Sequence, residues 1–169
     1  MALSANTPRS YDVGDTYNTL PVKASSTIYE GSAVGMTAGY ARALVAADEF
    51  AGFATAKAVG TGTDGVTQVT VKSRGRVQLA ITSLAVTDIG QSVYASADGT
   101  FTLTQTGNSQ VGKVVRWIST GEGVIEFEAH KIEPMQVISI PITLANVADG
   151  DVLTAYTPGF KGSIISVDF

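Results

Sequence analysis

The 169-residue sequence has no cysteine, a single histidine and few charged residues. Without cysteine there is neither a disulfide framework nor a thiolate nucleophile, and structural zinc sites need several Cys or His ligands. No apolar run approaches the roughly 18 residues of a membrane span, so we expect no transmembrane helix. The net charge of −4 argues against nucleic acid as a partner, because neutralising phosphates requires clustered Lys and Arg. The first residues lack the basic and apolar regions of a secretory signal, so we expect synthesis in the cytosol of the producing cell.

What the chain does contain is apolar and small. Hydrophobic residues make up 44% and charged residues only 15%, with 18 glycines. A chain of this length can bury one core, so we expect one domain, or one domain plus an appendage. The low charge and the abundance of Thr, Ser and Ala suit a β protein whose exposed faces are covered by another molecule.

The stretch 69–129 shows the period-two alternation of half-buried strands. Val77, Leu79 and Ile81 share one face, and Phe127 lies on the side of Ile125. Asp98-Gly99, between two alternating runs, predicts a tight hairpin with positive φ at the turn, and residues 120–123 predict a second hairpin. We therefore predict an all-β fold, a small antiparallel β-barrel or β-sandwich domain over residues 28–129.

The flanking segments differ from this domain. Residues 1–27 are polar and carry prolines and spaced aromatics, which favours an extended docking arm that orders on another surface. The alternative is a terminus that packs on its own domain. Residues 130–135 read as a linker, because Pro134 disfavours strand pairing. Residues 136–169 hold two strand-like runs, a C-terminal β segment that pairs with copies of itself, pairs with the domain or belongs to a larger protruding domain.

Two regions inside the domain have weaker patterns. Residues 43–60 are rich in alanine, yet Gly52 and the positions of the phenylalanines do not make a helical stripe. We predict a turn at 47–49, followed by a strand with Ala54, Ala56 and Ala58 on one face. Residues 83–91 predict a single helical turn before the next strand.

Motifs with possible chemistry have plainer explanations. Gly60 to Gly65 matches G-x-G-x-x-G, but the glycines precede a predicted strand and no helix follows to bind a pyrophosphate, so we predict a loop. Glu126 and Glu128 share one strand face, whereas glycosidase carboxylates face each other across a cleft. Residues 149–151 resemble a calcium loop without its remaining ligands. His130 has no recognisable nucleophile motif beside it. Arg74 and Arg76 suit either an acidic partner or a solvated bend.

No combination of side chains in the sequence indicates catalysis, so we predict no enzymatic activity, no cofactor and no metal. What remains is an arm, a bland β domain and an appendage. Trp117 is expected in a buried or interface-facing strand, with a sugar-stacking role as the alternative. These features are typical of an interaction protein.

Four stretches resemble the capsid cement (decoration, head-stabilising) proteins of tailed bacteriophages. They read VKASSTIYEGSAVGM, KSRGRVQLAIT, IGQSVYASADGTFTLTQTGNSQVGKVVRWIS and VIEFEA, and with the preceding arm the resemblance covers residues 9–129. Its most specific parts are 90–94 before Asp98-Gly99, and 112–115 after Gly107-Asn108. Residues 136–169 look like the first part of an additional β domain carried by some phage head proteins.

The resemblance implies a small β domain on the outer surface of the mature icosahedral head. Such proteins commonly bind as homotrimers at three-fold and quasi-three-fold positions, where they bridge major capsid proteins against the pressure of packaged DNA. An arm that orders only on the assembled lattice would supply specificity, and a trimer would add weak contacts. The alternative is a phage head fibre or host-glycan-binding module.

The resemblance also suggests which residues make contacts. For contact with the capsid, with backbone strand addition, we expect Leu3, Pro8, Arg9, Tyr11, Tyr17 and Leu20. For core or trimer contacts we expect Phe53, Trp117 and Phe127.

Overall fold

Eleven strands and one short 3₁₀ helix make up the part of the chain that the structure, a computed structural model, describes: residues 2–11 and 16–129. These residues belong to one unit, Met1–Ile132. The predicted linker at 130–135, the predicted segment 136–169, His130 and the 149–151 motif lie outside the described residues.

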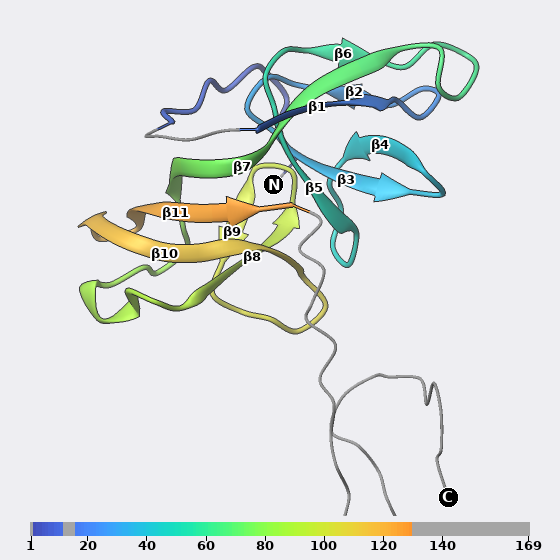
Figure 1. Ribbon diagram of the computed structural model, residues 1–169. Coiled ribbons are helices and arrows are strands. Elements are labelled where there is room, and N and C mark those ends of the chain that lie inside the picture. Colours follow the sequence, from blue (N-terminus) through green and yellow to red (C-terminus); the bar gives the residue numbers. More distant parts are fainter. Residues whose placement is uncertain (1, 12–15, 130–169) are drawn as a thin grey trace, which may run out of the picture. The chain divides into compact units, whose positions relative to one another are not determined.

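The strands form one large antiparallel sheet and one two-stranded sheet, as Figure 1 shows. Along the large sheet the order is β4 (Tyr40–Ala43), β3 (Ala33–Thr37), β5 (Glu49–Ala54), β7 (Gln68–Ala80), β11 (Glu122–Glu128), β10 (Ser109–Ser119), β8 (Ser92–Ala97) and β9 (Thr100–Thr102), and β1 (Thr16–Pro21) pairs with β7. The small sheet joins β2 (Thr27–Ile28) to β6 (Ala58–Val59), and the 3₁₀ helix η1 spans Val86–Asp88. The all-β prediction is confirmed. The described residues form a curled, sandwich-like arrangement without a closed barrel.

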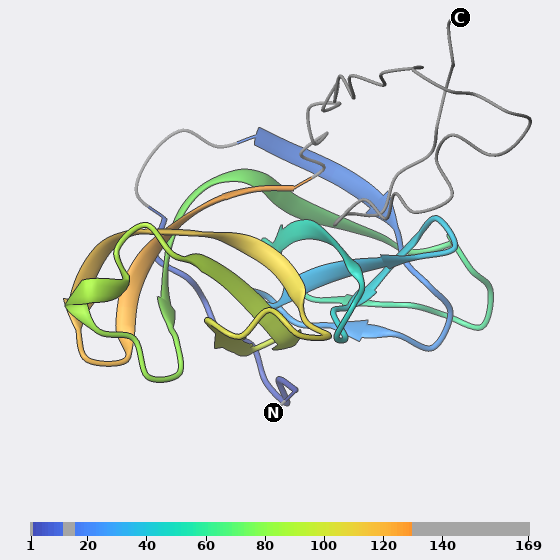
Figure 2. The ribbon, with the colours of Figure 1, turned by 90° about the horizontal axis from the view of Figure 1, so that it is seen from below.

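The long strand β7 organises the sheet, because both of its edges are paired. Arg74 pairs with Glu128 of β11 and with Thr16 of β1, and Val71 pairs with Ala54 of β5 and with Asn18 of β1. A strand residue has one partner on each edge. Strands β5 and β11 therefore share one edge of β7, and β1 lies along the other, as the outermost blue strand in Figure 2 shows.

The core consists of two clusters. The first is aromatic: the rings of Phe53 and Phe127 meet edge to face with centroids 4.9 Å apart, and Phe50 and Phe101 pack beside them. The second is aliphatic and rich in alanine, and includes Leu20. Strand β7 contributes to both, because Val77 and Leu79 enter the first cluster while its N-terminal residues enter the second.

Several details differ from the sequence predictions. Residues 16–27 belong to the β domain and not to a separate arm: β1 has the length of a full strand, and Leu20 is buried. The strand predicted through three alanines is interrupted at 55–57, so Ala54 and Ala58 are buried but Ala56 is exposed. The hairpins at 98–99 and 120–121 and the helical turn at 86–88 are present as predicted.

The Asp98-Gly99 turn forms without the predicted backbone. Neither residue has φ in the left-handed region. Glycine is needed at position 99 for space instead, because a Cβ built there would lie 2.6 Å from Cγ of Leu3. The prediction of a primed turn was therefore wrong: a distant segment of the chain, rather than the local backbone, accounts for the glycine.

Candidate protein-interaction site: the N-terminal strap and the edge of the sheet

Residues 2–11, which we call the N-terminal strap, run across the surface of their own domain. The backbone N–H of Leu3 donates to Oδ1 of Asp98 at 2.9 Å, and that of Thr7 donates to the carbonyl of Glu30 at 2.9 Å. Farther along, the carbonyl of Ser10 accepts from the N–H of Gln78, and Tyr11 forms an isolated antiparallel bridge. All ten residues are exposed or half-buried. The strap thus touches the domain at several points but contributes no buried residue to it.

Under the strap lies a seat formed by Gly31, Asp98, Gly99 and Phe101. The side chain of Leu3 covers Gly99, and the carbonyl of Thr7 sits where a Cβ on Gly31 would be. Arg9 donates from Nε to the carbonyl of Gly31 at 2.9 Å, and its guanidinium lies 5.5 Å from the centre of the Phe101 ring. Asp98 and Phe101 are each only 2% exposed with the strap in place.

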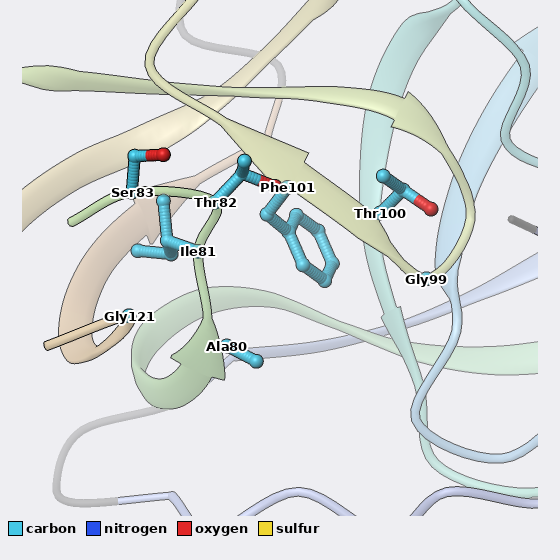
Figure 3. A pocket seen from close by; sticks show the side chains of 8 residues that line it. All are labelled: Ala80, Ile81, Thr82, Ser83, Gly99, Thr100, Phe101 and Gly121. Atoms are coloured by element: carbon cyan, nitrogen blue, oxygen red, sulfur yellow. The ribbon is translucent and has the colours of Figure 1, made fainter.

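A shallow depression adjoins this seat and shares Gly99 and Phe101 with it. Its volume is about 350 Å³, and it opens between residues 80–83 and β9. Figure 3 shows the Phe101 side chain between Thr82 and Gly99 at its margin, and the ring itself is almost fully buried. The lining contains hydroxyls and apolar groups but no charged side chain. This composition offers no group for acid–base chemistry, and a contact surface for the neighbouring strap is its simplest role.

The seat is an unfavourable environment for a charged side chain. Burial raises the pKa of Asp98 above its ordinary value, although the N–H groups of Leu3 and Asp98 and nearby positive charges, Arg9 among them, act in the opposite direction. Burial also lowers the pKa of Arg9. Covering the Asp98 carboxylate therefore has a cost, which the strap contacts offset only in part.

The second feature of the site is the open edge of β1. The first four residues of this strand are exposed, and within the described chain β7 is the only strand that pairs with it. The N–H of Thr19 donates to Oδ1 of Asn18 at 2.8 Å, while the carbonyl of its register partner Thr70 accepts from Thr55. The Thr19 and Thr70 pair is thus a non-hydrogen-bonded one, and the N–H and C=O of Thr19 face away from β7.

Two tyrosines connect the strap with β1 through one lysine. Nζ of Lys72 lies 4.0 Å from the centre of the Tyr11 ring and 5.3 Å from that of Tyr17. Tyr11 is half-buried against the aromatic cluster, whereas Tyr17 is 56% exposed. Tyr17 therefore presents a large apolar and polar surface at the outer edge of the sheet.

The six residues expected to contact a capsid differ in how exposed they are. Pro8 and Tyr17 are exposed; Leu3, Arg9 and Tyr11 are half-buried against the domain; and Leu20 is buried in the aliphatic cluster. In this structure the Leu20 side chain is therefore not accessible to a partner. The inner side chains of the strap are accessible only if the strap leaves its seat.

The three residues assigned to core or trimer contacts also differ in burial. Phe53 and Phe127 are fully buried in the aromatic cluster, so they serve the core. Trp117 is half-buried against the same cluster, and its Nε1 is buried without a hydrogen-bond partner among the described residues.

The remaining motifs have structural roles. The 60–65 loop is tied to the 23–26 turn, because Gly60 N–H donates to the carbonyl of Ser26 and Asp64 accepts from Ala24 N–H. Across β7 and β11, Arg76 pairs with Glu126 at 3.3 Å and Gln78 donates to Glu122 at 2.7 Å. Residues 2–11 and 16–129 contain no cluster of three or more potential metal ligands and no helix long and apolar enough to cross a membrane.

Sequence reasoning did not find the seat. The sequence pattern predicts Asp98 and Gly99 as turn residues only. The partner of Asp98 lies 95 positions away, so no local pattern reveals it.

Comparison of the sequence with models of known protein families gives no match, and neither does comparison with curated protein sequences.

Proposed function

We propose that this protein is a bacteriophage capsid cement protein, which binds the outer surface of the mature head, bridges adjacent major capsid proteins and stabilises the shell. The sequence resemblance supports this proposal, and so does the all-β architecture. The protein acts as a homotrimer at three-fold and quasi-three-fold positions, without catalysis, cofactor or metal.

The observation that carries the proposal is the open edge of β1. Sheet edges in isolated proteins are normally protected by charges, prolines or covering segments. Residues 16–20 contain no charge, the one proline of β1 is its last residue, Pro21, and the side chains of residues 16–19 are exposed. Because Thr19 turns its backbone groups outward, the edge suits an extended segment of a neighbouring protein that adds as a further strand.

The surface around this edge suits the same partner. Among the large hydrophobic residues of the described chain, only Val66 is more exposed than Tyr17, and Val86 equals it. Tyr17 sits beside the backbone groups that would pair, and aromatic residues are enriched at the centres of protein interfaces. In a shell-bound complex, Tyr17 packs on the capsid protein while the main chain of β1 supplies hydrogen bonds.

The proposal is tested with Thr19→Pro. Proline removes the outward N–H and blocks strand addition, but spares the β1–β7 ladder, to which this N–H does not contribute. Co-sedimentation with expanded heads, assembled from the partner major capsid protein, should show an affinity about tenfold lower or worse. Thr19→Val, which keeps the N–H and the β-branched shape, should bind like the wild type.

The controls separate docking from folding. Thermal unfolding should give closely similar midpoints for the Thr19→Pro and Thr19→Val variants. Unexpanded heads report specificity for the mature shell, and head survival on heating reports cementing. Full decoration by the proline variant would exclude the β1 edge as the docking surface, and absence of wild-type binding to any head would refute the proposed function.

A further inference from the structure

We infer that the N-terminal strap packs on its own domain in the free protein and is released when the protein docks. The inference rests on the proposed function and adds a regulatory step to it. The seat formed by Gly31, Asp98, Gly99 and Phe101 acts as a latch. The inner side chains of the strap become a second contact surface once the latch opens.

The first argument is accessibility. Leu3 lies against Gly99, Arg9 lies over Phe101, and Tyr11 packs on the aromatic cluster. These are the largest side chains in the strap, and all three contact their own domain. A partner can use them only after the strap lifts, so docking through the strap requires an opening step.

The second argument is how lightly the strap is held. None of its residues is buried, and residues 2–10 are joined to the domain by four direct hydrogen bonds, three donated by Leu3, Thr7 and Arg9 and one accepted by the carbonyl of Ser10. Segments with few buried contacts open locally at a free-energy cost far below that of global unfolding. Lifting the strap breaks none of the pairings between the named strands.

The third argument is the chemistry of the seat. The strap covers a carboxylate, Asp98, whose burial is unfavourable to its charge. When the strap lifts, this carboxylate regains water, while Gly99 and Phe101 become continuous with the neighbouring depression. The buried charge of Asp98 thus lowers the stability of the closed state, and opening removes this penalty. Such a penalty is expected of an element that has to exchange partners.

The latch can be tested with an engineered disulfide, because the chain has no cysteine of its own. A Cβ at position 99 would lie 2.6 Å from Cγ of Leu3. Cysteines at positions 3 and 99 therefore come within the Cβ separation of about 3.5–4.5 Å that a disulfide needs. The double variant Leu3→Cys, Gly99→Cys should form an intramolecular bridge when oxidised, seen as a monomer on a non-reducing gel.

Binding of this double variant to expanded heads is measured reduced and oxidised. The reduced protein should bind, and the oxidised protein should bind about tenfold more weakly or worse, because locking the strap lowers the fraction of competent molecules. Each single variant, treated with the same oxidant, controls for cysteine chemistry. Equal binding of the oxidised and reduced forms would overturn the latch, as would a bridge that forms only between copies.

A second variant, whose expected effect on head binding is the opposite, keeps the test decisive if the bridge perturbs folding. Gly99→Leu fills the space that Leu3 occupies and displaces the strap without altering any strap residue. The latch inference requires stronger head binding by this variant, and weaker binding would contradict it. If even the reduced double variant and the wild type fail to bind heads, the proposed function fails and not the latch alone.

Discussion

The N-terminal strap and β1 are consecutive parts of one segment and lie along the same edge of β7, yet they are held in different ways. Tyr11 bridges Val77, which pairs with Ile125 on its other side, just as Arg74 pairs with both β1 and β11. Strand β1 is joined by a continuous ladder and buries Leu20. The strap has scattered hydrogen bonds and buries nothing of its own.

The difference shows what fixes an edge segment to a domain. A ladder with one buried apolar side chain makes β1 part of the fold, because it removes apolar area from water. The strap instead covers groups that belong to the domain. The favourable contacts of Leu3 and Arg9 are offset in part by the unfavourable burial of the Asp98 charge. One region is part of the sheet with an open outer edge, and the other contributes no buried residue to the domain.

The largest test of this comparison is Leu20→Ala. Truncation leaves a cavity in the aliphatic cluster, and at an edge strand we expect a loss of about 2–3 kcal/mol in the free energy of unfolding. Urea denaturation measures it. Thr19→Ala, at the exposed neighbouring position, should cost less than about 1 kcal/mol. Equal losses for the two variants would show that β1 is held no more firmly than the strap.

The sequence predicted the centre of the sheet better than its edge. The alternation of Val77, Leu79 and Ile81 is local, and their burial is confirmed. The hairpins at 98–99 and 120–121 were predictable because the residues that pair are close in the chain. In β1, by contrast, Leu20 pairs with Val69, and a polar strand with one buried residue carries little periodic signal before that partner is known.

The candidate site was predicted in part. The polar, proline-bearing composition set residues 1–27 apart as one docking arm, whereas in the structure residues 2–11 pack on their own domain, as in the alternative interpretation, and β1 joins the sheet. What could not be read from the sequence is that Leu3 and Arg9 already have partners. Their contacts to Asp98 and Phe101 depend on how residues about 90 positions apart in the chain come together, and on the space left by a glycine.

A smaller effect is expected from Arg9→Met, which keeps the side-chain length but removes the charge over Phe101 and the hydrogen bond to Gly31. We expect the closed strap to lose about 1 kcal/mol, so the Thr7 amide, which is bonded to Glu30, should exchange about fivefold faster. Lys57→Met removes a comparable contact, to the Tyr29 ring, outside the strap seat. It should leave Thr7 exchange unchanged, and an effect as large as that of Arg9→Met would contradict a specific role for Arg9.

The smallest effect concerns pH and the carboxylate under the strap. Because burial raises the pKa of Asp98, the folded protein holds this proton more tightly than the unfolded chain. The contribution of Asp98 to stability is therefore fully present below its ordinary pKa of 3.8 and is lost as pH rises through the raised folded value. Asp98→Asn cannot titrate, and its amide oxygen can still accept from the Leu3 N–H.

Urea denaturation of the wild type and of Asp98→Asn at several pH values between about 4 and 7 isolates this term, because the other carboxylates cancel in the difference. Relative to the wild type, the asparagine variant should gain stability as pH rises, since only the wild type then carries the buried charge. A difference that moves the opposite way would mean that the Leu3 N–H and the charge of Arg9 outweigh burial. The seat would then favour a closed strap at neutral pH, and the strap would resemble β1 in how firmly it is held.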